Sequence, residues 1–180
     1  METKKHTLHS NNLNGNLVWI TGLSGAGKTT LANTLKENML GEGHKPILLD
    51  GDMLREILGL KYKGYSPEER KKLSFCYARL ANLLVNQGFF VIVATISMFE
   101  SVRNWNRENN CKYCEVYLKV NRQTRISRDS RKIYELNTEL VEIEKGFDEP
   151  KKPDIIFDHT WRLSDMVSQI KKLIGIINEN

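Results

Sequence analysis

The stretch LVWITGLSGAGKTTL, residues 17–31, decides the fold of this chain. An apolar run over 17–20 precedes the pattern G-x-x-x-x-G-K-[ST] at 22–29, and a helical pattern follows. A strand, a glycine loop and a helix start in that order are the context of a phosphate-binding loop. Glycines allow positive φ and bring main-chain N–H groups close to an anion, and the first helical turn adds its unpaired N–H groups. We therefore predict a nucleotide site in which Lys28 reaches the β- and γ-phosphates and Thr29 ligates Mg²⁺.

Length and composition are typical of one globular domain. The chain has 180 residues, of which 40% are hydrophobic and 27% charged, with a net charge of +5. We expect a loose polar tail over 1–14 and a single domain over 15–180. No apolar run approaches the ~20 residues of a membrane span. The N-terminus lacks the apolar core of a signal peptide, and three cysteines make no disulfide framework, so we predict a cytoplasmic protein with no membrane partner.

Strand patterns alternate with helical patterns along the chain. This alternation predicts a three-layer αβα fold of the phosphate-loop NTPase type, with a five-stranded parallel sheet. The expected strands cover residues 17–20, 46–49, 89–94, 114–118 and 155–157. The expected helices cover about 28–40, 53–58, 66–88, 99–109 and 166–177, with Ser66 as the cap of the third.

Two acids follow the second strand, at Asp50 and Asp52. Because the carboxyl ends of parallel strands meet at one crevice, these acids should face the phosphate loop. That arrangement suits a small-molecule kinase, in which an acid sits beside the acceptor hydroxyl; a helix cap is the alternative role for Asp52. A GTPase or motor ATPase commonly carries its acid after a later apolar strand, but the strand at 89–94 ends without one, and no N-K-x-D motif is present.

Several motifs together resemble the adenylylsulfate kinase family. They are TGLSGAGKTT at 21–30, LDGDxxR at 49–55, GYSPEER at 64–70, VIVAxIS at 91–97, RDSRKIY at 128–134 and GFDEP at 146–150. The similarity runs from about residue 13 to the C-terminus. The resemblance implies transfer of the γ-phosphate of MgATP to the ribose 3′-hydroxyl of a nucleotide, a helical lid over about 121–149, and a homodimer.

The resemblance also implies roles for single residues. Lys28 and Asp52 are the implied catalytic residues, with Asp52 orienting or deprotonating the hydroxyl, and Asp50 lies near the metal beside Thr29. The expected nucleotide-binding set is Gly22, Leu23, Ser24, Gly25, Ala26, Gly27, Lys28, Thr29 and Thr30, with Arg128 and Arg131 in the lid. The expected acceptor-binding set is Asp52, Arg55, Tyr65, Arg70, Ile96 and Ser97, in which the arginines hold anionic groups.

The sequence departs from the family on the acceptor side. Where the family usually has N-I-R-R, this chain has Leu-Ser-Phe-Cys at 73–76, and F-I-S-P-Y-R becomes Thr-Ile-Ser-Met-Phe-Glu at 95–100. A second aromatic wall is missing near Glu144. Each lost arginine removes charge-assisted hydrogen bonds of roughly 1.5–3 kcal/mol. We therefore expect the reaction type to be kept with an altered acceptor; cytidine diphosphoramidate kinase, a related capsule-modification activity, phosphorylates a comparable pyrimidine nucleotide.

Two readings from other classes stay open. One is a regulatory module that binds a nucleotide without catalysis, which the intact Lys28 and acids disfavour. The other is a polynucleotide kinase, which would need a long basic groove with interleaved aromatics; we see none and expect no nucleic-acid partner.

The stretch 159–161, His-Thr-Trp, fits a base contact or a surface turn. Cys76 is expected in the core, and Cys111 and Cys114 are expected to be free thiols.

Overall fold

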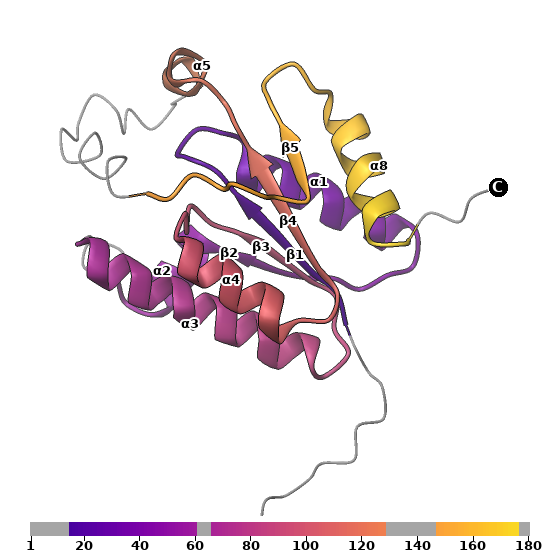
Figure 1. Cartoon of the computed structure of the whole chain (residues 1–180). Coiled ribbons are helices and arrows are strands. Elements are labelled where there is room, and N and C mark those ends of the chain that lie inside the picture. Colours follow the sequence, from indigo (N-terminus) through magenta and orange to yellow (C-terminus); the bar gives the residue numbers. More distant parts are fainter. Residues whose placement is uncertain (1–14, 61–65, 129–146, 177–180) are drawn as a thin grey trace, which may run out of the picture.

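A computed structural model describes residues 15–60, 66–128 and 147–176 (Figure 1). Within these residues the strands are β1 (Leu17–Thr21), β2 (Ile47–Asp50), β3 (Val91–Ala94), β4 (Tyr113–Leu118) and β5 (Ile155–Phe157). The helices are α1 (Lys28–Gly41), α2 (Gly51–Ile57), α3 (Pro67–Val85), α4 (Glu100–Asn109), α5 (Arg122–Ser127) and α8 (Leu163–Leu173). The predicted alternation of strands and helices is confirmed.

The five strands form one parallel sheet in the order β2-β3-β1-β4-β5. β1 lies in the middle, with β3 on one side and β4 on the other. The strand order reverses next to β1, and in open sheets of this kind ligands bind outside the carboxyl ends at such a point. The glycine loop follows β1 and therefore lies at this point of the sheet.

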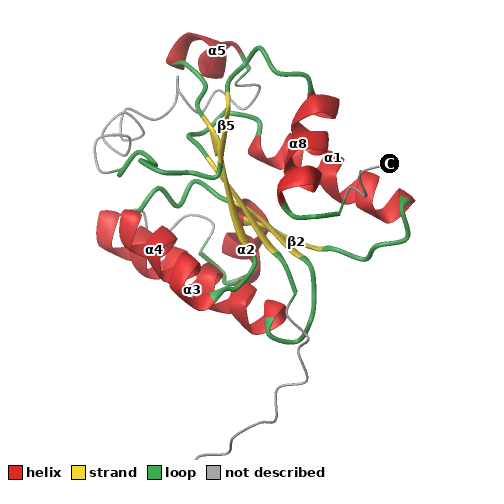
Figure 2. Cartoon of the chain, turned by 45° about the vertical axis from the view of Figure 1, so that its right-hand side comes forward, coloured by secondary structure: helices red, strands yellow, loops and turns green. Residues whose placement is uncertain are grey.

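Helices cover both faces of the sheet, as Figure 2 shows. Val18 and Ile20 pack into the cluster with α1 and α8, whereas Leu17 and Trp19 pack into the cluster with α3 and α4. All four side chains are fully buried, because each face of β1 has a helical layer over it. The predicted three-layer architecture is confirmed. No helix among the described residues is long and apolar enough to cross a membrane.

The helix ends show where local chemistry was predicted well and where it was not. Ser66 caps α3 as predicted, in a capping box with Glu69. The cap of α2 is Asp50, whose carboxylate accepts from the Asp52 and Met53 amides, so the capping role considered for Asp52 is wrong. α3 ends at Val85, three residues before Gly88, which was expected to stop it. A helix end is set by local backbone hydrogen bonds, here from the Asn86 amide, and glycine marks it only approximately.

Candidate functional site

The glycine loop leaves β1 in the conformation that an anion site needs. Gly25 and Gly27 have φ of 76° and 96°, in the left-handed region that favours glycine. Gly27 is the N-cap of α1 and provides no side chain, so the first-turn amides are left for another acceptor. The loop closes on itself through the Ala26 amide, which donates to the Leu23 carbonyl at 3.2 Å. This arrangement of amides can cradle a phosphate.

Lys28 and Thr29 open α1 directly behind the loop. The Lys28 ammonium donates to the Leu23 carbonyl at 2.9 Å, so its side chain folds back over the loop rather than away from it. Thr29 is exposed, and its hydroxyl donates to Asp50 Oδ2 at 2.8 Å. The two predicted phosphate and metal residues therefore lie at the same end of the helix, beside Asp50 at the end of β2.

The Asp50 carboxylate contacts both Thr29 of α1 and the first main-chain amides of α2 at this edge of the sheet. One carboxylate oxygen accepts from Thr29, and the other accepts from the Asp52 amide at 2.9 Å and the Met53 amide at 3.4 Å. These contacts hold the start of α2 against the loop. A threonine hydroxyl and a carboxylate are hard oxygen ligands of the kind that Mg²⁺ takes together with nucleotide phosphates. The pair Thr29 and Asp50 therefore fits the predicted metal site.

Asp52 is exposed on the first turn of α2, and Tyr77 of α3 packs beneath that turn. The Tyr77 hydroxyl donates to the Gly51 carbonyl at 3.3 Å. Burial raises the pKa of Tyr77 to about 12, with Arg55 acting against the rise and Asp52 adding to it. Asp52 and Arg55 lie three residues apart on α2, so the helix puts the predicted acid and one predicted anion-binding arginine on neighbouring turns of one face.

The segment after β3 lies beside the glycine loop. The Thr21 hydroxyl donates to the Ile96 carbonyl at 2.6 Å, which ties this segment to the end of β1. Ser97 is 4% exposed, and its hydroxyl has no hydrogen-bond partner among the described residues. A buried hydroxyl without a partner is uncommon, and one beside a site can bind a ligand. Ile96 and Ser97 thus lie next to the end of β1 and the glycine loop, and their role in acceptor binding stays a prediction.

The Arg70 side chain packs against a pair of aromatic rings. Its guanidinium lies over the Phe147 ring at 4.7 Å, and that ring meets Phe99 edge-on at 5.9 Å between centroids. These three residues come from α3, from the segment 147–154 and from the start of α4. The sequence patterns did not predict the aromatic pair, because neither phenylalanine belongs to a periodic run that specifies its partner. We call this group the Phe147 wall.

Two of the predicted site residues, Tyr65 and Arg131, lie outside the described residues, as does most of the expected lid. The part of that region that is described forms α5. Its backbone closely approaches the glycine loop, since a Cβ on Gly25 would lie 2.7 Å from the Arg125 carbonyl oxygen. Arg128 follows at the C-terminal end of α5 and is exposed. A nucleotide on the loop would therefore have α5 beside it.

A hollow lies beyond the carboxyl ends of β4 and β5. It is lined by Lys119, Asn121, Ile156, Asp158, His159 and Trp161. Trp161 meets the buried Phe157 ring edge-on at 5.0 Å, which fixes the indole at the rim. The stretch 159–161 forms an exposed turn, in which the Thr160 amide donates to Asp158 Oδ1 at 2.9 Å, and it also borders this hollow. A base contact there stays a prediction. Lys119 was not singled out in the sequence.

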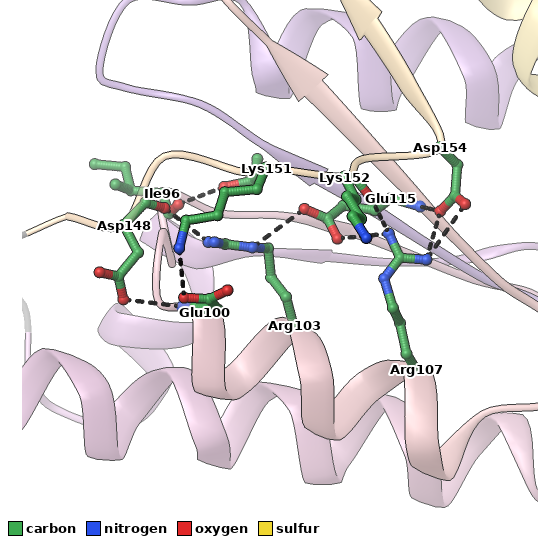
Figure 3. Close-up of polar contacts among 10 residues, drawn as sticks. Ile96, Glu100, Arg103, Arg107, Glu115, Asp148, Lys151, Lys152 and Asp154 are labelled. Carbon is green, nitrogen blue, oxygen red and sulfur yellow. Dashed lines mark hydrogen bonds and ion pairs between the residues drawn. The ribbon is translucent and has the colours of Figure 1, made fainter.

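A charge network joins α4 to β4 and to the segment 147–154, as Figure 3 shows. Glu115 of β4 is 2% exposed and pairs with Arg103 at 3.2 Å and Arg107 at 2.9 Å, both from α4. Burial raises the pKa of the Glu115 carboxyl, and the two arginines oppose that rise. The sequence contains a signal for this network. A charged residue inside an apolar strand needs a partner, and arginines four residues apart on one helix provide it.

The cysteines carry no metal chemistry among the described residues, where no group of three or more His, Cys, Asp or Glu side chains converges. Cys111 and Cys114 are free, as predicted. Burial raises the pKa of the Cys114 thiol to about 12. Cys76 is exposed, so its predicted place in the core is wrong. Its neighbours Leu73 and Tyr77 carry the buried stripe of α3, and residue 76 falls beside that stripe.

Comparison with known proteins gives matches over most of the chain. A family model described as adenylylsulphate kinase matches residues 14–158. The cytidine diphosphoramidate kinase of Campylobacter jejuni is 35% identical over 167 residues, covering 89% of this chain and 96% of that protein. The adenylyl-sulfate kinase of Bacillus licheniformis is 34% identical over 163 residues, covering 87% and 82%. The APS kinase of Mycobacterium tuberculosis, solved with AMPPNP and APS, has a TM-score of 0.80 at 27% identity, covering 90% and 98%.

Proposed function

The chain belongs to the adenylylsulphate kinase family, and from this premise we propose that it transfers the γ-phosphate of ATP to a sugar hydroxyl of a nucleotide that carries a modified phosphate. The observation that carries the proposal is the 2.8 Å contact between the Thr29 hydroxyl and Asp50. It joins the start of α1, directly after the phosphate loop, to Asp50 at the end of β2. A donor tail on the loop and an acceptor hydroxyl at Asp52 would then be neighbours.

The donor side holds the triphosphate by charge and by main-chain amides. The loop amides and the Lys28 ammonium neutralise the phosphate oxygens, on which negative charge accumulates during transfer. Thr29 and Asp50 would hold Mg²⁺, which when bound neutralises further charge on the transferred group. Trp161 and His159 supply a surface for the donor base in the hollow beyond β4 and β5.

The acceptor side has to orient one hydroxyl. Asp52 lies on the exposed first turn of α2, which Tyr77 supports from below through the Gly51 carbonyl. Its carboxylate accepts the hydroxyl proton as the oxygen bonds to the γ-phosphorus and ADP departs. Arg55 and Arg70 bind the anionic groups of the acceptor, and Ile96 and Ser97 border the nucleotide.

A specific observation favours cytidine diphosphoramidate over adenylylsulfate as the acceptor. The positions where the family usually has two arginines carry Phe75, under Arg79 at 5.7 Å, and the exposed Cys76. Ser74 donates its hydroxyl to the Arg70 carbonyl, so it is engaged within its own helix. A phosphoramidate end carries an NH₂ donor where a sulfate end has a further acceptor oxygen, so it needs fewer guanidinium donors around it. The match to the Campylobacter jejuni enzyme, over 96% of its length, supports the same choice.

The experiment is an ADP-release screen over cytidine diphosphoramidate, adenylylsulfate and plain nucleoside diphosphates. We expect acceptor-dependent release that needs Mg²⁺ and is fastest with cytidine diphosphoramidate. Lys28→Ala should lower turnover by about 10²–10³-fold while the fold survives, and Lys45→Ala, an exposed lysine outside the site, is the matched control. Nucleotide binding without acceptor-dependent release would instead support the non-catalytic module.

The homodimer and the cytoplasmic location remain predictions. Light scattering on the purified chain tests the first, since a dimer would have twice the monomer mass of 20.8 kDa. Cell fractionation tests the second. Neither result changes the assignment of the site residues, because every contact described above lies within one chain.

A further inference from the structure

Arg103 bridges β4 and the segment 147–154, and the proposed reaction gives this side chain no role of its own. It is 4% exposed and leaves the first turns of α4. Its Nε pairs with Glu115 of β4 at 3.2 Å, while Nη1 donates to the Asp148 main-chain carbonyl at 2.9 Å (Figure 3). The planar guanidinium can satisfy both partners at once because its donors lie in a fixed fork. One buried side chain therefore links the sheet to the segment 147–154.

Asp148 is held from two more sides. Its amide donates to the Met98 carbonyl at 2.7 Å, and its carboxylate accepts from the Glu100 amide at 3.1 Å. Phe99, the N-cap of α4, makes no side-chain cap, so Asp148 caps this helix from a distant part of the sequence. The main chain at 148 is thereby fixed against residues 98–100, directly after Ser97.

The fixed main chain carries the Phe147 wall. Phe147 precedes Asp148, its ring rests on Phe99, and Arg70 lies over it at 4.7 Å. Arg70 is one of the residues expected to bind the acceptor. A shift at Asp148 would therefore move the ring on which the Arg70 guanidinium lies, and with it the acceptor-binding group, without touching the glycine loop.

Arg107 provides an internal control, because it binds the same Glu115 carboxylate but contacts a different part of the chain. It pairs with Glu115 at 2.9 Å and with Asp154 at 3.2 Å, and it donates to the Lys152 carbonyl at 2.8 Å. These contacts fasten the far end of the segment 147–154, where it enters β5. The two arginines thus share Glu115 but hold opposite ends of the same segment.

We propose that Arg103 is a positioning residue for acceptor binding: through Asp148 it fixes the Phe147 wall and the start of α4, while Arg107 has only a structural role. The proposal rests on the proposed function, since it names a determinant of that same site. Replacing Arg103 leaves the Asp148 carbonyl without this donor and the main chain at 147–148 less tightly held. Misplacing a binding group by a small distance is costly, because the bound geometry has to bring the hydroxyl to the phosphorus.

The experiment compares Arg103→Met with Arg107→Met in the full chain. Both variants remove one cation from Glu115, so both should lose thermal stability. Only Arg103→Met should raise the acceptor KM, by about tenfold or more, with the ATP KM unchanged within about twofold. Amide hydrogen exchange gives a readout that needs no turnover: the Asp148 and Glu100 amides should exchange faster in Arg103→Met and at the wild-type rate in Arg107→Met.

Two further variants keep the test decisive if Arg103→Met does not fold. Arg103→Lys keeps a cation at Glu115 but loses the fork, and Asp148→Ala loses the cap of α4 while leaving the Arg103 pair with Glu115 intact. Each should raise the acceptor KM and the exchange of the Glu100 amide. Equal acceptor KM values in the Arg103 and Arg107 variants, or unchanged exchange in Arg103→Met, would overturn the proposal. Wild-type protein that turns over no acceptor would overturn the proposed function and this inference with it, whatever the exchange rates.

Discussion

The proposed donor side and the proposed acceptor side of this site are built in different ways. The proposed phosphate-binding part of the donor side is one continuous piece of chain, residues 21–30, which offers main-chain amides and left-handed glycines. The acceptor side is assembled from α2, α3, the segment after β3 and the segment 147–154, and it depends on side chains. A site made of backbone tolerates change elsewhere in the protein, whereas a site made of side chains from four segments can be altered one residue at a time. This difference fits a chain that keeps a complete phosphate loop while the motif departures noted in its sequence cluster on the acceptor side.

The first prediction tests whether Asp52 is the acid that brings the acceptor hydroxyl to the donor phosphate. Asp52→Asn keeps the shape and the helix position of residue 52 but removes the proton acceptor. Turnover should fall by about 10²–10⁴-fold, as expected for loss of a general base, with little change in the ATP KM. Steady-state kinetics on each acceptor gives the measurement.

Asp165→Asn, on the first turn of α8, is the matched control and should leave turnover unchanged. Near-normal turnover in Asp52→Asn would show that this residue of α2 is not the proton acceptor. Another acid on the acceptor side would then have to take that role.

The second prediction tests how far the donor side depends on its backbone. Gly25→Ala forces an L-residue to φ 76° and brings its Cβ within 2.7 Å of the Arg125 carbonyl oxygen. The left-handed conformation alone costs about 1–2 kcal/mol, and the close approach adds to it. The ATP KM should rise by about tenfold or more, and the acceptor KM should change much less. Gly43→Ala has φ 84° with nothing within 4 Å of the new Cβ, so it measures the conformational cost by itself.

Thermal unfolding of both glycine variants separates the two effects. Gly43→Ala should lower stability without any change in kinetics. If Gly25→Ala also left the ATP KM unchanged, the loop backbone would not be the main determinant of donor binding.

Prediction from the sequence succeeded where the physics is local or periodic. The apolar runs specified the strands, since a strand covered on both faces has to be apolar throughout, and the order of strands and helices specified a parallel sheet. The phosphate loop was recognised because glycine, lysine and threonine must stand at fixed spacing. Ser66 was recognised as a cap for the same reason.

The failures concern contacts between distant residues. Nothing near Asp148 in the sequence indicates that it caps α4, and the partners of Arg103 lie 12 and 45 residues away.

Cys76 was placed in the core because α3 has a strong apolar stripe, yet a helix shows only one face to the sheet. A stripe predicts that a buried face exists more reliably than it predicts which borderline residue belongs to it.

The third prediction sharpens the comparison by rebuilding part of the acceptor side. Cys76→Arg puts a cation where the family usually has one, at an exposed position that needs no repacking. A hydrogen bond to a charged group contributes about 1.5–3 kcal/mol, so the adenylylsulfate KM should fall by about tenfold. The KM for cytidine diphosphoramidate should stay the same or rise, and the ATP KM should not change. Cys111→Arg, at an exposed thiol before β4, is the control for a general effect of added charge.

The smallest expected effect concerns Glu149, which lies beside the Phe147 wall and makes an ion pair with Lys119 at 2.8 Å. The hydrogen bond from Lys119 holds the pKa of the Glu149 carboxyl below its ordinary value of 4.5. A carboxyl whose pKa is lower in the folded state stabilises the fold above its unfolded pKa, and this contribution is lost as the pH falls through the folded value.

Both groups are more than half exposed, so solvent screens the pair and the difference should stay within about 1 kcal/mol. The difference in melting temperature between wild type and Glu149→Gln should therefore be constant well above pH 4.5, shrink as the pH falls below that value, and vanish only once the folded-state carboxyl is itself protonated. Lys119→Met should remove the same pH dependence. A difference that persisted at low pH would mean that Glu149 acts through its hydrogen bond from Tyr117, at 3.2 Å, rather than through its charge.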